Sequence, residues 1–242
     1  MLSIGGSYES AAKPTRSLYQ FRVLLMLCDE LGFHLAQECF WFNPAKLPGP
    51  AEWVNVRRIR IKDSVEYVFW LSKTLFPKAS NRNVLVEYSK DMLRLIERGY
   101  KAKERPSGWN ITGKCKNHRG DTIPSNLIEA GNNGSNGVYM SRCKEAGIKP
   151  HPARFPAALP DFFVRLLTDE HDVVVDPLAG SNTTRRVVEN LGRRWLGFEL
   201  DDGYVAASRF RFIDEELLNP NDRTAEQRRR SSRRALAGPS PA

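Results

Sequence analysis

The 242-residue chain has few of the features that mark membrane-bound or disulfide-stabilised proteins. Its four cysteines, Cys28, Cys39, Cys115 and Cys143, are too widely spaced to form a disulfide-rich framework. No stretch reaches the roughly 18 apolar residues of a membrane span. Met1 is not followed by a basic and then apolar leader. We therefore expect a soluble, cytoplasmic protein whose thiols are free.

Metal binding is the other role that the cysteines could serve. Cys115 and His118 have the Cys-x-x-His spacing of two zinc ligands, and Cys143 and His151 are the next candidates along the chain. The later spacings match no common zinc module. The sequence therefore predicts no metal site.

Acidic residues are fewer than basic ones, 28 against 37, which gives a formal charge of +9 and a pI of about 9.5. This excess favours a polyanionic partner, because each phosphate that Lys or Arg neutralises releases a condensed counterion. Many soluble proteins are nevertheless basic without such a partner. Within residues 221–242, six arginines stand against two acidic residues, a net +4. Residues 214–242 are thus expected to form a basic, disordered tail.

Hydrophobic patterning predicts an α/β domain, and the apolar fraction of 41% is enough for a core. The expected strands cover residues 1–4, 35–42, 65–71, 172–176 and 195–198, and the expected helices 16–31, 90–98, 160–167 and 183–190. Thr15 is the expected N-cap of the first helix, and Gly32 lies at its C-terminus. The apolar face of that helix is formed by Leu18, Phe21, Leu24, Leu25 and Cys28. Residues 77–147 are expected to be largely irregular.

Residues 172–199 have the pattern of a nucleoside-binding βαβ unit. The run Val173–Val175 predicts a parallel strand buried on both faces. A small-residue turn follows, in which Gly180 lets the backbone approach a ligand and the start of the next helix directs N–H groups at it. Glu199 ends the second strand about 20 residues later, where such folds place a carboxylate against ribose hydroxyls. On this pattern alone, an ordinary βαβ unit with a glycine turn remains an alternative.

Several segments carry a resemblance to a known family. Asp-Pro-Leu-Ala-Gly-Ser-Asn-Thr-Thr at 176–184 resembles the Asp-Pro-Phe-x-Gly-Ser-Gly/Asn-Thr-Thr-Gly motif of DNA amino-methyltransferases. His-Pro-Ala-Arg-Phe-Pro at 151–156 resembles the element that precedes it in the permuted members. Segments 14–19, 41–48, 52–55, 62–65, 105–108 and 123–127 are similar to cytosine-N4-specific methyltransferases of restriction-modification systems. The matches follow the family order from residue 5 to about 213.

The resemblance implies a Rossmann-like S-adenosylmethionine-dependent methyltransferase fold with an incomplete sheet. The implied cofactor-binding residues are His151, Phe155, Pro156, Asp176, Pro177, Leu178, Gly180, Ser181, Asn182, Thr183 and Glu199. Two positions depart from the motif: Leu178 replaces the Phe that packs beside adenine, and Arg185 replaces the final Gly. Loss of the aromatic ring should weaken cofactor binding by about 1 kcal/mol.

The family also implies a Ser/Asp-Pro-Pro-Tyr/Phe loop that hydrogen-bonds the target amine and stacks on the extruded base. This tetrapeptide does not occur in the sequence, and Asn43-Pro44-Ala45 is the nearest string. In the family order the loop lies upstream of Gly5-Gly6, so we expect no catalytic residue in this chain. Two hypotheses explain its absence: a truncated or mis-started reading frame, or a split enzyme in which a separate chain supplies the catalytic strand.

Basic and polar residues suggest where DNA would bind. Residues 98–147 occupy the family's target-recognition position and contain Lys101, Lys103, Arg105, Trp109, Lys114, Lys116, Arg119, Asn132, Asn133, Asn136, Tyr139, Arg142 and Lys144. Lys and Arg suit phosphates and guanine edges, and Asn suits adenine edges, although any one of these side chains could simply be solvated. Arg57, Arg58 and Arg60 form a second basic stretch that suits backbone phosphates.

The sequence thus predicts four segments. These are a partial catalytic half (1–97), a target-recognition region (98–147), a cofactor-binding part (148–213) and a basic tail (214–242). The leading hypothesis is a cytosine-N4 methyltransferase that acts on double-stranded DNA. The alternatives are an adenine-N6 enzyme of the same class and a non-catalytic remnant that binds DNA or the cofactor.

Overall fold

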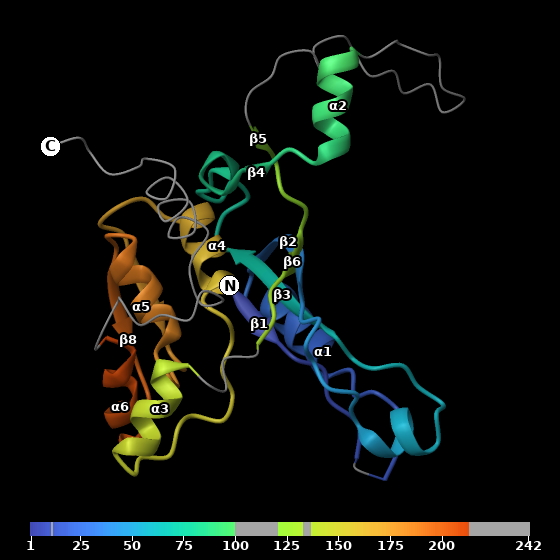
Figure 1. Cartoon of the computed structure of the whole chain (residues 1–242), viewed down its shortest axis with the longest axis vertical. Helices are drawn as coiled ribbons and strands as arrows, with labels where there is room; N and C mark the ends of the chain where they lie inside the picture. Colours follow the sequence, from blue (N-terminus) through green and yellow to red (C-terminus); the bar gives the residue numbers. More distant parts are fainter. Residues whose placement is uncertain (11, 100–120, 133–136, 213–242) are drawn as a thin grey trace, which may run out of the picture. The chain divides into compact units, whose positions relative to one another are not determined.

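The computed structural model describes residues 1–10, 12–99, 121–132 and 137–212. The chain divides into two compact units, one formed by Met1–Ala79 with Asn126–Ala242 and the other by Ser80–Ser125 (Figure 1). Half of the predicted target-recognition region (98–147) and all of the predicted tail (214–242) lie outside the described residues. None of the helices in the described part is long and apolar enough to cross a membrane.

The first unit contains a four-stranded sheet with the strand order β1-β3-β2-β6. Its strands are β1 (Leu2–Ile4), β2 (His34–Phe42), β3 (Val65–Ser72) and β6 (Leu127–Glu129). Strands β1 and β2 run antiparallel to β3, whereas β6 runs parallel to β2. Strands β1, β2 and β3 are confirmed, and each of their ends lies within one residue of the predicted end. Strand β6 was not predicted.

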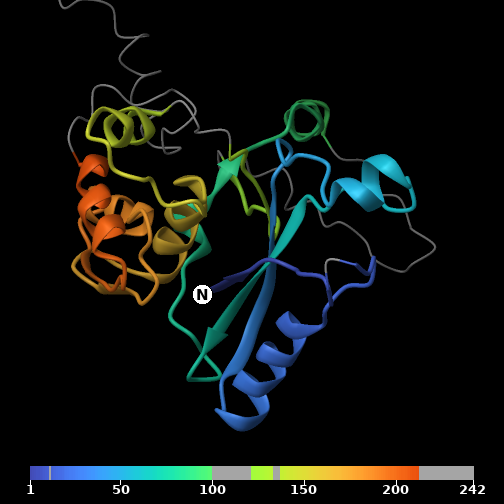
Figure 2. The ribbon, with the colours of Figure 1, turned by 90° about the horizontal axis from the view of Figure 1, so that it is seen from below.

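The two faces of this sheet bury different side chains. Phe40 and Tyr67 are paired across β2 and β3, and the Tyr67 ring packs edge-on against Phe21 of α1 (Tyr19–Leu25) with 5.3 Å between ring centroids. Helix α1 lies beside these two strands (Figure 2). On the other face Val68 is buried, and the buried Trp41 donates its indole N–H to the Ala130 carbonyl at 2.8 Å. The sheet therefore supplies a large part of the unit's core.

Helix α1 differs from its prediction at both ends. It spans Tyr19–Leu25 and continues as the π-helical turn η1 (Met26–Glu30). The prediction that Thr15 caps a helix starting at residue 16 is wrong. Thr15 Oγ1 donates instead to Glu9 Oε2 at 2.8 Å, and Arg16 pairs with Asp63 at 2.6 Å, so side-chain contacts keep this segment out of the helix.

The expected apolar face of α1 is only partly buried. Leu18 and Leu25 are 54% and 58% exposed, whereas Phe21 contacts the sheet. Gly32 has a φ of +69°, which confirms its expected place just after the helical segment.

The predicted βαβ unit is confirmed in the same unit. Strands β7 (Val173–Asp176) and β8 (Arg194–Gly197) form a parallel pair, and α5 (Thr183–Asn190) connects them (Figure 1). The expectation that β7 is buried on both faces is wrong, because Val173 and Val175 are 51% and 55% exposed. Within the described residues, α5 packs against both strands and α4 (Ala158–Leu167) packs against α5.

The first unit also contains a small helical core. It joins α3 (Val138–Glu145) to α6 (Asp202–Ser208) and the 3-10 turn η6 (Arg209–Arg211). Its buried residues are Tyr139, Cys143, Ala207 and Phe210. Helix α3 was not predicted, and the expected DNA-facing position of Tyr139 is wrong because only 4% of this residue is exposed.

The second unit contains α2 (Lys90–Arg98), whose predicted limits are confirmed. Ser89 caps this helix, since its hydroxyl accepts the Met92 N–H at 3.1 Å. The unit also holds the 3-10 turn η3 (Asn81–Val84) and the antiparallel pair β4 (Val86–Glu87) and β5 (Asp121–Thr122).

Candidate functional site

The loop at 176–184 follows the carboxyl end of β7, and Asp176 fixes its shape. One carboxylate oxygen of Asp176 accepts the Leu178 N–H at 3.2 Å, and the other accepts the Thr184 hydroxyl at 2.6 Å. Asn182 completes the turn in the left-handed conformation, with φ +63°, and donates its N–H to the Ala179 carbonyl at 2.7 Å. Asp176 therefore acts within the loop as an anchor for the start of α5.

Gly180 brings the backbone of this loop against the His151 ring. Its φ of +53° is a conformation that other residues rarely adopt, and a Cβ atom there would lie 3.2 Å from the His151 ring. The Gly180 N–H donates to Glu199 Oε2 at 2.8 Å. This bond links the loop after β7 to the residue that follows the end of β8.

Glu199 is held as an ionised acceptor. Its other oxygen, Oε1, accepts the N–H groups of Asp201 at 3.1 Å and Leu200 at 3.0 Å. The Asp201 N–H is the largest cause that lowers the pKa of Glu199, and the Gly180 and Leu200 N–H groups and nearby His151 lower it further. A carboxylate has about four lone-pair sites, and these three N–H groups leave room for a further donor such as a ribose hydroxyl.

The His151 ring lies against the loop and is held there by its own contacts. The imidazole Nδ1 lies 2.6 Å from the Ala153 carbonyl oxygen, and the ring meets Tyr204 edge-on at 4.6 Å. The backbone N–H of His151 donates to the Tyr139 hydroxyl at 3.2 Å. The ring is thereby fixed over Gly180 from both the α3 and the α6 sides.

The start of α5 adds a cluster of hydroxyl groups. Ser181 and Thr183 are buried, and their hydroxyl oxygens lie 3.2 Å apart. Arg211 donates to Ser181 Oγ at 3.1 Å. The first N–H groups of a helix have no acceptor within that helix, so this end of α5 favours an anionic group.

Two apolar side chains flank these polar groups. Leu178 and Leu200 follow β7 and β8 and are 84% and 99% exposed. The site thus offers an acceptor for hydroxyls at Glu199, donors for a carboxylate at α5 and apolar surface for a flat base. S-adenosylmethionine, a nucleoside with an amino-acid end, needs each of these three kinds of contact.

Several predicted cofactor residues therefore contact one another, and others do not take part in the contacts described above. His151 contacts Gly180, which is bonded to Glu199, and Ser181 contacts Thr183. Phe155 and Pro156 are half-buried after His151, and Pro177 is exposed in the loop. Tyr204 and Arg211 were not predicted at this site, and Tyr139 was assigned to the target-recognition region instead.

The predicted DNA-binding arginines mostly have local partners. Arg57 pairs with Glu52 at 2.7 Å and stacks on Trp53 of the π-helical turn η2 (Glu52–Val56). Arg60 lies 5.0 Å from the ring centroid of Tyr8 and donates to the Pro14 carbonyl.

Of the remaining arginines, Arg58 is exposed with a φ of +54°, and Arg142 forms a pair with Glu145 at 3.6 Å within α3. Arg105, Trp109 and Arg119 lie outside the described residues. The DNA-binding roles of all seven residues stay predictions.

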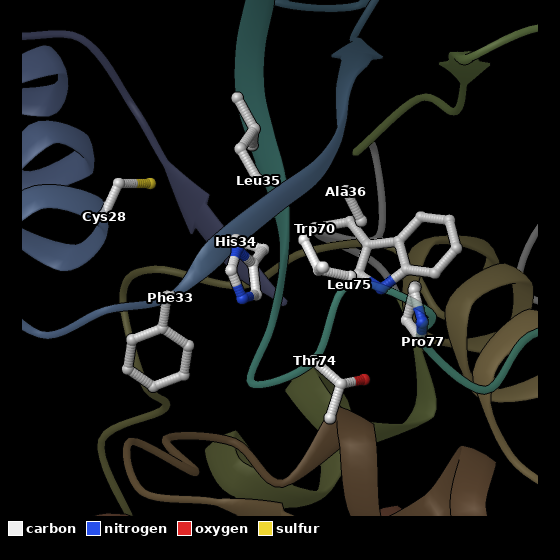
Figure 3. A pocket seen from close by; sticks show the side chains of 9 residues that line it. All are labelled: Cys28, Phe33, His34, Leu35, Ala36, Trp70, Thr74, Leu75 and Pro77. Atoms are coloured by element: carbon white, nitrogen blue, oxygen red, sulfur yellow. The ribbon is translucent and has the colours of Figure 1, made fainter.

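A cavity of about 550 Å³ lies elsewhere in the first unit, where β2 begins and β3 ends (Figure 3). Its lining residues are Cys28, Phe33, His34, Leu35, Ala36, Trp70, Thr74, Leu75 and Pro77. None of the predicted site residues lines it. The cavity and the loop at 176–184 are therefore separate features.

The parallel strand pair, the glycine loop and the carboxylate after β8 define a class: an α/β protein with a nucleoside-binding unit. A sequence model of the DNA methylase family matches residues 2–210. The chain belongs to this DNA methylase family, which confirms the resemblance in its motifs.

Individual relatives support the same assignment. Type II methyltransferase M.PvuII of Proteus hauseri is 50% identical over 220 residues, which cover 90% of this chain and 65% of the relative. Type II methyltransferase M.HindIII of Haemophilus influenzae is 23% identical over 187 residues, or 76% of this chain and 52% of the relative. The chain thus spans less than two thirds of the length of either curated relative.

A solved structure described as PvuII DNA methyltransferase (cytosine-N4-specific) superimposes with a TM-score of 0.70 and 43% identity. The superposition covers 94% of this chain and 67% of that structure. It confirms the predicted Rossmann-like α/β methyltransferase fold.

Proposed function

We propose that this chain is the cofactor-binding part of a cytosine-N4 DNA methyltransferase that takes its methyl group from S-adenosylmethionine. The observation that carries the proposal is the bond from the Gly180 N–H to Glu199, which joins the glycine loop to the carboxylate after β8. The 50% identity to M.PvuII, together with the cytosine-N4 specificity of the solved relative, favours cytosine N4 over adenine N6 as the target.

In this proposal each part of the cofactor has its own contact. Glu199 accepts hydrogen bonds from the ribose hydroxyls, because its lowered pKa keeps it ionised. The start of α5 with Thr183 receives the methionine carboxylate. Leu178 and Leu200 pack beside the adenine, where Leu178 gives less stacking than the Phe common in the family.

The substrate would be double-stranded DNA, and a separate chain would supply the catalytic strand. Within the described residues β1 pairs only with β3 and β7 pairs only with β8, so each has one edge open to a further strand. The sequence contains no Ser-Pro-Pro-Tyr type tetrapeptide, so the group that polarises the target amine would come from that chain.

A methyl-transfer assay tests both statements. The chain is mixed with the segment of M.PvuII that has no counterpart here, labelled S-adenosylmethionine and DNA, and the products are digested to nucleosides. Labelled N4-methylcytosine supports the proposal, whereas labelled N6-methyladenine supports the adenine alternative. No transfer by a mixture that still binds the cofactor rejects the separate-chain statement, and Glu199→Ala is the matched negative control.

A further inference from the structure

The side chain of Arg211 connects two buried groups beside the cofactor loop. It comes from η6, and its Nη2 lies 3.1 Å from Ser181 Oγ. Its guanidinium carbon also lies 4.2 Å from the centroid of the Tyr139 ring. Ser181 and Tyr139 are each only 4% exposed. A charge held against such buried partners has lost much of its hydration, so these contacts fix its position.

Arg211 restricts the hydrogen bonds that Ser181 can make in the loop. An arginine can only donate, so Ser181 Oγ must be the acceptor in their bond. Ser181 Oγ and Thr183 Oγ1 lie 3.2 Å apart, a distance at which either hydroxyl can donate. With one lone pair of Ser181 already used by Arg211, the arrangement that we favour has Ser181 as the donor and Thr183 as the acceptor. In that arrangement Thr183 keeps its own hydrogen to donate.

The same arginine is also linked, through Tyr139, to His151. Tyr139, on which the guanidinium stacks, accepts the backbone N–H of His151 through its hydroxyl at 3.2 Å. The His151 ring in turn covers Gly180. Arg211 therefore contacts Ser181 in the loop and also Tyr139, which holds His151 over the loop.

We propose that Arg211 is a positioning residue that, through Ser181, turns the Thr183 hydroxyl into a donor for the carboxylate of the cofactor's methionine end. This inference rests on the proposed function and deepens it, since it assigns one end of S-adenosylmethionine to one hydrogen-bond chain. Thr183 is the first residue of α5, so its hydroxyl and the unpaired N–H groups of the helix start would present donors alone to the ligand.

Two ligands separate this role from a general packing role. S-adenosylhomocysteine has the amino-acid end, and 5′-methylthioadenosine has the same nucleoside without it. Arg211→Met keeps a long apolar side chain but removes the donors. We expect it to weaken S-adenosylhomocysteine binding about tenfold, as loss of a charge-assisted hydrogen bond does. Binding of 5′-methylthioadenosine should stay within about twofold of the parent chain.

Arg209→Met is the matched control, because Arg209 lies in the same turn and stacks on Phe210. It should leave both affinities unchanged. Ser181→Ala in the Arg211→Met background should add little further loss, since both residues belong to one hydrogen-bond chain.

Thr183→Val gives a second, independent variant should Arg211→Met fail to fold. It removes the proposed donor, and we expect the same selective loss of S-adenosylhomocysteine binding. Equal losses for both ligands, or no loss for either, would overturn the positioning role. A parent chain that binds neither ligand would instead overturn the proposed function, so the two failures are distinguishable.

Discussion

At the scale of single residues, Arg185 has a structural role at a position where the family motif commonly has Gly. Its guanidinium lies 3.8 Å from the ring centroid of Trp195 and 4.1 Å from that of Phe212. It also pairs with Glu189 one turn along α5 at 3.7 Å. The substitution thus joins α5 to β8 and to the segment that follows η6.

Replacing Arg185 by glycine should lower the free energy of unfolding by about 2 kcal/mol. Roughly half comes from glycine inside a helix, and the rest from removing the cation that stacks on the two rings. Arg185→Lys keeps the charge and the helix propensity, so it should lose about half as much. Urea denaturation measures both, and equal stability of all three chains would contradict this role.

The lowered pKa of Glu199 makes a prediction about pH. A carboxyl group whose pKa is lower in the folded chain contributes fully above its unfolded pKa, and that contribution is lost as the pH falls through the folded pKa. Cofactor affinity and loop order should therefore be constant near neutral pH and decline only below the ordinary titration range of Glu.

An NMR titration of the Glu199 side-chain carboxyl carbon measures this directly. A glutamate in a short unstructured peptide serves as the reference carboxyl. A Glu199 midpoint at or above that of the peptide glutamate would contradict the hydrogen-bond pattern around the loop.

At the scale of elements, the sequence predicted those helices and strands whose periodicity or capping is local. The limits of α2 and α5 followed from their flanking residues and apolar spacing. The start of α1 did not, because the competing contacts of Arg16 are made with Asp63, 47 residues away. Helix α3 was missed because its core positions, Tyr139 and Cys143, become meaningful only against α6 and η6.

The candidate site divides in the same way. The pair formed by Gly180 and Glu199 was predicted because a βαβ unit fixes where a glycine turn and the next carboxylate meet. The contact between Ser181 and Arg211 spans 30 residues and follows from no periodic pattern. The exposed face of β7 was also misjudged, since a run of three valines does not say how many layers cover a strand.

Neighbouring valines in β7 test which face of the strand is covered. Val175 is 55% exposed, whereas Val174 is half-buried on the alternate face. Val174→Thr should lower the free energy of unfolding by about 1 to 2 kcal/mol, because it buries a hydroxyl. Val175→Thr should change it by less than about 0.5 kcal/mol. Thermal or urea unfolding of the two variants checks this, and equal losses would contradict the assignment.

At the scale of the whole molecule, charge and fold are distributed unequally. Residues 221–242 carry a net +4 of the total +9, and they lie outside the described residues. The cofactor site, by contrast, is built from described residues between Tyr139 and Arg211. Affinity for DNA and affinity for the cofactor should therefore be separable by truncation.

Removing the chain from Asn221 onward should make DNA binding less sensitive to salt. For each phosphate that the shortened chain no longer neutralises, the slope of log affinity against log salt becomes shallower by about 0.9. A salt-titrated binding assay on the full and shortened chains measures the slopes. Unchanged slopes would refute a role of the tail in DNA binding, and an altered cofactor affinity would refute the separation of the two functions.

The most direct test of the cofactor site is calorimetric titration of S-adenosylmethionine into the chain and into Glu199→Ala, with Glu170→Ala as the charge-matched control. We predict binding by the parent chain and the control, and an affinity at least about tenfold weaker for Glu199→Ala, because the ribose hydroxyls lose a charged acceptor. Equal affinities for the parent chain and Glu199→Ala would contradict the placement of the cofactor between β7, α5 and β8.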